Sequence, residues 1–94
     1  MIFFWSRTFG QKRSGKWTSF RKRHIKDKCE VCKRTKRLEL HHIVPFWVSP
    51  DIELDPLNVV TLDRRCHFAF GHFFNWRDWN INIKTWIKDI YETI

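Results

Sequence analysis

Histidine side chains are concentrated in one stretch of the chain, from Leu40 to His72. This stretch holds four of the five histidines, one of the three cysteines and the asparagine Asn58. An imidazole changes its charge near neutral pH and binds metal ions through a ring nitrogen. So many histidines in one short segment therefore indicate proton transfer, metal binding, or both.

Three short elements are expected to bring these histidines together. Residues 38–42 alternate as in a strand with one face on the core, and residues 59–62 form a second β-prone run. Prolines mark a loop at residues 45–57 between them, and a helix that bears His67 is expected to begin near Leu62 or Asp63. Neighbouring histidines in a strand would point to opposite faces, so the pair at 41–42 is expected where the first strand ends or bulges.

The same residues resemble the HNH endonuclease family, which has the ββα-metal fold. The resemblance rests on His41-His42 followed by Ile-Val-Pro, on Asn58 before the second strand, and on Cys66-His67, whose histidine lies nine residues after Asn58. It implies an α+β fold with a two-stranded antiparallel hairpin plus a helix, together with a zinc knuckle. Residue patterns on either side of this core predict an N-terminal basic helix and a C-terminal amphipathic helix that flank it.

The resemblance also assigns catalytic roles. His42 resembles the general base that deprotonates the attacking water. His41 and His67 resemble ligands of one divalent ion, which could be Mg, Mn, Ni or Zn. His72 is a further candidate ligand, but it follows His67 by five residues rather than four, so a helix end or bulge is required to bring both to one ion.

Other candidate catalytic residues surround the histidines. By the resemblance, Asn58 would hydrogen-bond backbone across the loop and hold the strand that bears the general base; a simple turn asparagine is the alternative. Arg64 and Arg65 fall in the first turn of the expected helix, where they would hold the phosphate. The loop is expected to be anchored by four apolar side chains, Phe46, Trp47, Ile52 and Leu54.

The cysteines predict a second metal site. Cys29 and Cys32 form a Cys-x-x-Cys motif, and Cys66 supplies a third thiolate. Many HNH proteins carry a fourth cysteine three residues before the last one, where this chain has Asp63. We expect a structural zinc held by Cys29, Cys32, Cys66 and Asp63, with three buried thiols and no metal as the alternative. Asp63 could equally cap the helix.

Positive charge is concentrated in the first part of the chain. Residues 1–37 carry thirteen Lys and Arg against two acidic residues, a net charge of +11, whereas residues 38–94 have a net charge of −3. A helix is expected at residues 14–27 with Ser14 as N-cap, packing Trp17, Phe20 and Ile25. His24 on the same face is expected to pack rather than bind metal. The candidate DNA-binding residues are Lys12, Arg13, Arg21, Lys22, Arg23 and Lys26.

These features predict a single HNH nuclease domain over residues 1–94. Its parts are an aromatic and basic arm (1–13), a basic helix with the Cys knuckle (14–37), the ββα-metal core (38–72) and a C-terminal helix (73–94). An apolar stripe at residues 82–93 is expected to pack on the core as a lid, with dimerisation as the alternative.

The expected function is metal-dependent DNA endonuclease activity, by nicking or double-strand cleavage. The alternative is a zinc-knuckle DNA-binding module that keeps the fold without the chemistry. Double-stranded DNA is the expected partner, with a second copy of the chain or a phage packaging protein as further candidates and no membrane. Reduced thiols and the absence of a signal segment indicate the cytoplasm, in a cell that hosts a phage or mobile element.

Overall fold

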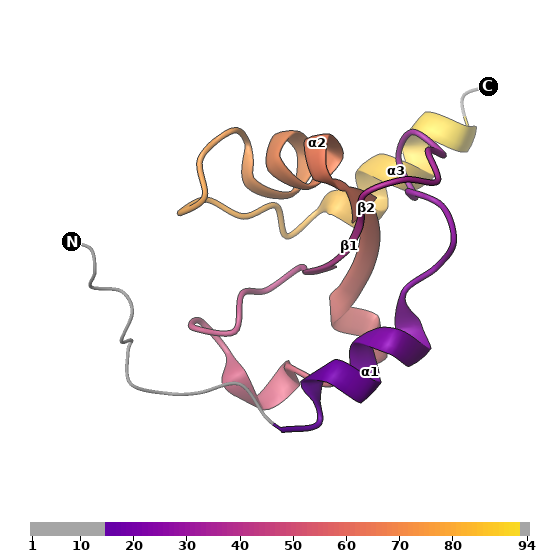
Figure 1. Cartoon of the computed structure of the whole chain (residues 1–94). Helices are drawn as coiled ribbons and strands as arrows, with labels where there is room; N and C mark the ends of the chain where they lie inside the picture. Colours follow the sequence, from indigo (N-terminus) through magenta and orange to yellow (C-terminus); the bar gives the residue numbers. More distant parts are fainter. Residues whose placement is uncertain (1–14, 93–94) are drawn as a thin grey trace.

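The computed structural model describes residues 15–92. The arm, Lys12, Arg13 and Ser14 lie outside the described residues. The elements in chain order are α1 (Trp17–His24), β1 (Leu38–His42), the 3₁₀ turns η2 (Pro50–Ile52) and η3 (Pro56–Asn58), β2 (Val59–Asp63), α2 (Arg64–Cys66), the π-helical turn η4 (His67–Gly71) and α3 (Ile83–Glu92) (Figure 1). This arrangement confirms the expected α+β class and ββα core. None of the helices within residues 15–92 is long and apolar enough to cross a membrane.

The hairpin of β1 and β2 separates the candidate residues onto two faces. The strands pair antiparallel, with His41 opposite Val60 and His42 opposite Val59. Residues paired in this way share a face, and the faces alternate along each strand. In Figure 1, α1 lies below the hairpin and α2 lies above it. Side chains at 39 and 41 therefore face α2, and those at 40 and 42 face α1.

Each face has its own apolar cluster. On the α1 side, Phe20 packs with Leu40 and Val59. On the α2 side, the buried members of the cluster come from the knuckle, β2, α2, α3 and the residue after β1: Cys29, Ile43, Val60, Leu62, Cys66 and Ile83. Burial of apolar surface in these two layers fixes the strand register, since a slip of one residue would exchange the faces of both histidines.

Helix α1 is shorter than the expected helix at 14–27. It ends at His24 because Ile25 is extended, and the next backbone N–H, that of Lys26, donates to Thr61 Oγ1 at 2.9 Å rather than continuing the helix. His24 stacks on Phe20 with ring centroids 4.3 Å apart, which is the packing role expected for it. The long-range bond to β2 thus overrides the local helical pattern.

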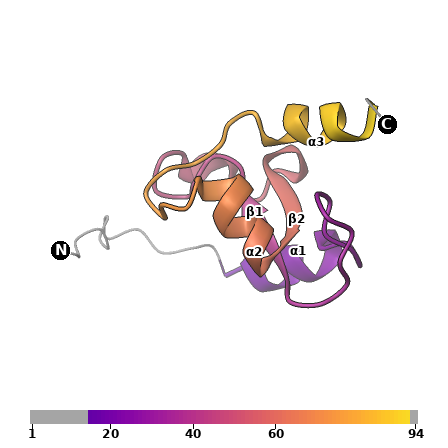
Figure 2. The same cartoon turned by 90° about the horizontal axis from the view of Figure 1, so that it is seen from above.

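Helix α3 packs against the knuckle through part of its apolar stripe. Ile83 is fully buried, Ile87 packs on the same cluster, and the Tyr91 hydroxyl donates to the Val31 carbonyl. The Lys33 ammonium lies 4.5 Å above the Tyr91 ring. Figure 2 shows α3 at the edge of the molecule, so only one side of the helix meets the core. The packing role of the stripe is therefore confirmed for these residues, and dimerisation through its exposed part stays a prediction.

Candidate functional site

Three histidines meet on the α2 side of the hairpin. His41 comes from β1, His67 begins η4, and His72 directly follows it. One ring nitrogen of each lies within 4.8 Å of those of the other two, and the Nε2 atoms of His67 and His72 are 3.3 Å apart. The structure thus brings together all three histidines that the sequence suggested as metal ligands.

The π-helical turn explains how His67 and His72 share one side. They are five residues apart, a spacing that would separate them by well over a quarter turn on an α-helix. Over His67–Gly71 the chain forms a π-helical turn, whose i to i+5 hydrogen bonding brings residues five apart toward the same side of the helix. The spacing of the two histidines predicted a helix end or bulge, and the structure has a π-turn there. Turns of this kind are frequent at functional sites.

The outer hydrogen bonds of these rings leave Nε2 as the electron-pair donor. His72 Nδ1 lies 2.7 Å from the Asp78 carbonyl oxygen, which only accepts, so Nδ1 carries the hydrogen. His67 Nδ1 lies 2.7 Å from Glu39 Oε1, which requires the same tautomer beside an ionised carboxylate. Two nitrogen lone pairs then face each other at 3.3 Å. Such a pair is stabilised by a cation or a proton between them.

His41 completes this donor set. Its side chain is 2% exposed, and its Nε2 is a buried polar atom without a hydrogen-bond partner among the described residues. Burial, with the nearby His67 and His72 rings, lowers the pKa of His41 to about 2, so the ring is neutral and its lone pair is available. An unpaired buried nitrogen costs free energy unless something coordinates it. The three nitrogens therefore fit a divalent metal ion.

Gly71 makes room for the His41 ring. A Cβ at this position would lie 3.1 Å from both His41 Cε1 and Nε2, closer than ordinary van der Waals contact. We expect Gly71→Ala to displace the ring and weaken metal binding at least about tenfold, as disturbance of supporting residues commonly does. Calorimetric titration with Mn²⁺ measures this, and Gly15→Ala, where nothing lies within 4 Å of the added atom, is the matched control. Unchanged Mn²⁺ affinity would show that the ring position is not critical.

His42, the candidate general base, lies on the opposite face of β1. Its Nε2 is 2.8 Å from the Glu53 carbonyl oxygen, and its ring packs against Trp17 with centroids 4.5 Å apart. A carbonyl only accepts, so Nε2 carries the hydrogen and Nδ1 the lone pair. His42 is the last residue of β1. Its ring is held by the loop, through the Glu53 carbonyl, and by α1, through Trp17.

Asn58 ties the ends of the loop together. Its Oδ1 accepts from Val44 N at 2.9 Å, and its Nδ2 donates to Val44 O at 3.1 Å and to Ile52 O at 3.4 Å. Ile43 N also donates to the Asn58 carbonyl at 2.8 Å. These bonds hold the backbone that follows His42.

The prediction that Trp47 anchors the loop is wrong, because this side chain is 55% exposed. Leu54, another expected anchor, packs on the α1-side cluster.

Asn58→Ala is expected to lower thermal stability and activity together. The change leaves the half-buried Val44 N–H and carbonyl without their partners, at a cost of about 1 to 3 kcal/mol. Melting curves and cleavage rates of Asn58→Ala should be compared with those of Leu57→Ala, the exposed neighbour. A loss of activity at an unchanged melting temperature would contradict the supporting role.

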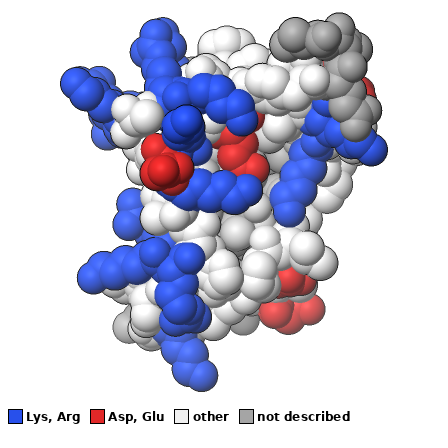
Figure 3. All heavy atoms as spheres, turned by 90° about the vertical axis from the view of Figure 1, so that its right-hand side faces the viewer, with Lys and Arg blue, Asp and Glu red and all other residues white. Residues whose placement is uncertain are grey.

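Arg64 and Arg65 border a basic groove. Arg64 Nε lies 3.7 Å from Glu39 Oε2, so Glu39 contacts both this arginine and His67. The groove has a volume of about 450 Å3 and is lined by Lys33, Arg34, Thr35, Lys36, Arg37, Asp63, Arg64 and Arg65. Figure 3 shows many Lys and Arg side chains on the face turned to the right in Figure 1. Such a surface attracts polyanions.

The basic residues of α1 are only in part available to a partner. Lys22 and Arg23 are exposed, whereas Arg21 is half-buried. Lys26 lies beyond the helix and pairs with Glu30 Oε1 at 3.3 Å. Lys33, Arg34, Lys36 and Arg37 line the groove and add positive charge to that of the six candidate DNA-binding residues.

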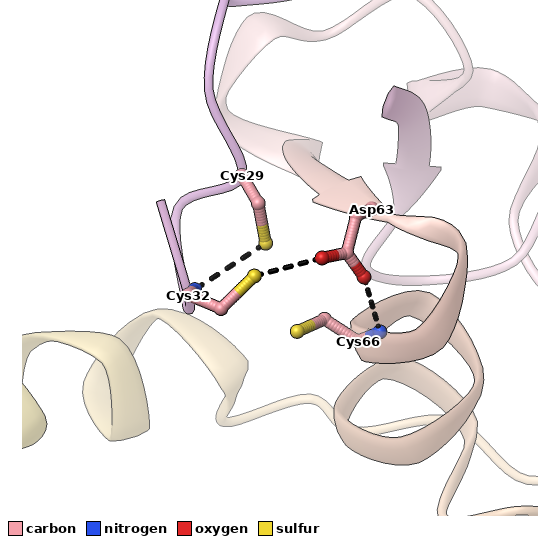
Figure 4. Close-up of side chains that lie close together, drawn as sticks. All are labelled: Cys29, Cys32, Asp63 and Cys66. Atoms are coloured by element: carbon pink, nitrogen blue, oxygen red, sulfur yellow. Dashed lines mark hydrogen bonds between the residues drawn. The ribbon is translucent and has the colours of Figure 1, made fainter. Parts of the chain in front are cut away.

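The three cysteines and Asp63 form a second cluster of metal-binding groups. One donor atom of each lies within 4.8 Å of the others (Figure 4). Asp63 uses its two oxygens differently: Oδ1 accepts from Cys66 N at 2.8 Å and caps α2, while Oδ2 accepts from the Cys32 thiol at 2.7 Å. The capping and metal-binding alternatives are therefore compatible. Cys29 and Cys66 are buried but Cys32 is exposed, so the alternative of three buried thiols does not describe this cluster.

The environment of this cluster lowers the pKa of Cys29 and Asp63, which favours their anionic forms. Burial and hydrogen bonding raise the pKa of Cys32 and Cys66, which favours the neutral thiols. Burial raises the pKa of Cys29, but backbone N–H groups of the knuckle outweigh it and lower the pKa below its usual value. For Asp63, too, hydrogen bonds from Cys32 and Cys66 outweigh burial and lower the pKa. Burial and the neighbouring thiols raise the pKa of Cys66. Three sulfur atoms and one carboxylate oxygen are donors that Zn²⁺ accepts, so the set fits a structural metal site.

Sequence reasoning missed two residues of the histidine site. Glu39 holds His67, and its position two residues before His41 could have placed it on the same face of the strand. Trp76 packs against both His67 and His72, with centroids 5.4 and 4.8 Å apart, and no local pattern indicated this contact.

A β-hairpin with a helix folded on it, bearing a histidine cluster between strand and helix, is consistent with the ββα-metal fold. The family model described as HNH endonuclease matches residues 29–72, a segment that contains both candidate metal clusters. The resemblance to HNH endonucleases is thereby confirmed for this segment. Comparisons with curated proteins and with solved structures give no match.

Proposed function

We propose that the chain is a metal-dependent DNA endonuclease that hydrolyses phosphodiester bonds. The observation that carries the proposal is the group of three histidine nitrogens with lone pairs, one of them buried and unpaired, inside the segment that matches the HNH family. His41, His67 and His72 would hold one divalent ion there. When bound, such an ion neutralises charge on the scissile phosphate and on the leaving oxygen.

His42 would take the proton from the attacking water. Its Nε2–H is engaged by the Glu53 carbonyl, which fixes the tautomer with Nδ1 as acceptor. Packing against Trp17 limits rotation of the ring. A base held in orientation before the reaction needs less reorganisation to reach the transition state. Asn58 would support this arrangement by fixing the backbone after the strand.

Arg64 and Arg65 would bind the phosphate, and Glu39 would support the histidine site. The arginines are exposed beside the basic groove, where their guanidinium groups could bind phosphate oxygens. Glu39 would orient His67 through Nδ1, as carboxylates beside metal-binding histidines do. The cluster of Cys29, Cys32, Cys66 and Asp63 would hold a structural zinc that joins the knuckle to α2.

Nicking of supercoiled plasmid tests the proposal. Purified protein should convert plasmid to the relaxed or linear form with Mg²⁺, Mn²⁺, Ni²⁺ or Zn²⁺, and EDTA should stop the reaction. The basic surface alone would also suit a DNA-binding module without chemistry. Plasmid that is retarded in a gel but never cut, with every metal ion tried, would favour that alternative.

DNA affinity is expected to fall steeply with salt. Binding of basic residues to DNA releases counterions, with a slope of about −0.9 in log K against log[salt] for each phosphate neutralised. Replacing the candidate α1 residues Arg21, Lys22, Arg23 and Lys26 with glutamine should reduce the magnitude of the slope. Fluorescence anisotropy over a salt series measures it, and the same change at Lys33, Arg34, Lys36 and Arg37 shows whether the groove carries the remainder. An unchanged slope in both variants would place the DNA contacts elsewhere.

A further inference from the structure

An aromatic loop, residues 73–76, borders the histidine cluster and exposes large rings. Phe74 is 70% exposed, Trp76 is 58% exposed and Phe73 is 43% exposed. Adjoining exposed apolar side chains are unusual on a protein surface unless they meet a partner. The loop is therefore a candidate binding surface that the proposed chemistry does not use.

The backbone that exposes these rings adopts a strained conformation at Phe73 and Phe74. Phe73 and Phe74 have φ angles of 53° and 63°, in the left-handed region that bulky residues rarely adopt. Strain of this kind persists only where surrounding bonds enforce it, and it clusters at functional sites. Here Phe74 N donates to Phe68 O at 3.0 Å, and Asn75 N donates to His72 O at 2.9 Å. The exposed rings are thus presented by a fixed loop.

The loop is joined to the histidine site by ring contacts. Trp76 packs on His72 and His67, with centroids 4.8 and 5.4 Å apart, and on Phe68 at 4.8 Å. Phe73 is anchored differently, against Trp86 of α3 at 5.6 Å. A phosphate that reached the histidine nitrogens would bring the attached nucleotide next to Trp76 and Phe74.

We propose that the aromatic loop stacks on a nucleobase that is unpaired or displaced from the duplex next to the scissile phosphate. The inference rests on the proposed function, because the histidine site places DNA beside the loop. A base offers a flat π surface of the kind that exposed aromatic rings bind, with little dependence on sequence. Arg77, exposed directly after Trp76, supplies a positive charge for the adjoining backbone. The enzyme would therefore prefer duplexes with an unpaired base.

Binding to three duplexes of one sequence tests this proposal. The full chain carrying His42→Ala is used so that the DNA is not cut. The duplexes are fully paired, with one extra unpaired adenine, and with an abasic residue in place of that adenine. The duplex with adenine should bind about tenfold more tightly than the abasic one, since the two differ only in the base available for stacking.

Variants in the same background locate the effect. Phe74→Ala should remove the preference for adenine over the abasic residue while leaving the salt slope unchanged, because that slope reports phosphate contacts. Phe74→Trp should restore the preference. Trp47→Ala, which removes an exposed tryptophan from the loop between the strands, should retain it.

Two results would overturn the inference. One is an undiminished preference for adenine in both Phe74→Ala and Trp76→Ala proteins. The other is a dimer in sedimentation that Phe74→Ala converts to monomer at unchanged DNA affinities, which would assign the loop to contact between copies of the chain. Failure of the parent protein to bind any duplex would instead contradict the proposed function itself, and the inference with it.

Discussion

Replacement of His42 by alanine is expected to reduce DNA cleavage by at least about a hundredfold, since general acid–base catalysis commonly contributes 10²- to 10⁴-fold. Metal affinity should remain close to that of the wild type, because the ring lies on the opposite face of β1 from the three histidine nitrogens. Nicking rate and Mn²⁺ affinity measured on one preparation test both parts. A variant that still cuts within tenfold of the wild-type rate would remove His42 from this role.

The buried position of His42 calls for a stability control. Its ring packs on Trp17, so the alanine variant should also melt at a lower temperature. Leu40→Val alters a buried side chain on the same face of the same strand without touching an imidazole, and should cost about 1 kcal/mol of stability. Activity should be compared well below both melting transitions. If Leu40→Val loses as much activity as His42→Ala, packing rather than proton transfer explains the effect.

If the cysteine cluster holds the proposed zinc, its loss should have the largest effect on stability. Cys29 is fully buried among the apolar residues of the α2-side core, and the knuckle is joined to α2 through Asp63. We expect purified protein to carry about one tightly held zinc, and Cys29→Ser to lose both the zinc and about 4 kcal/mol or more of stability. Metal analysis after dialysis against a chelator and melting curves measure this. A wild-type protein that never carries zinc would refute the structural-zinc proposal.

The two proposed roles of Asp63, capping of α2 and zinc binding, can be tested with separate substitutions. Asp63→Cys offers zinc a fourth thiolate but removes the cap on α2, which is worth about 0.5 to 2 kcal/mol. Zinc retention should therefore rise while the melting temperature of the metal-free form falls. Asp63→Asn can keep the cap but loses the anionic ligand, so its deficit should appear only in the zinc-loaded form. If Asp63→Asn shows no deficit even in the zinc-loaded form, Asp63 serves only as a cap.

Much of the site could be predicted from short-range patterns. The alternation at residues 38–42 and the β-prone run at 59–62 are local signals, and the structure forms β1 and β2 there. Residue types carry the metal chemistry, because only imidazole, thiolate and carboxylate groups offer suitable donors. The resemblance to the HNH family indicated the histidine set, and the Cys-x-x-Cys motif indicated the second cluster, from the sequence alone. The division of the chain at residues 14, 38 and 73 remains a prediction.

The tertiary structure decided how those residues are used. His72 reaches His67 only because the chain is wound as a π-turn, and Glu39 meets His67 across 28 residues of sequence. Asp63 divides its oxygens between a local cap and Cys32, 31 residues away. Such contacts depend on how the knuckle, hairpin and helix pack, which local propensity does not encode. The exposed rings of Phe74 and Trp76 beside the histidines follow from the same packing, since a sequence pattern alone would place aromatic side chains in the core.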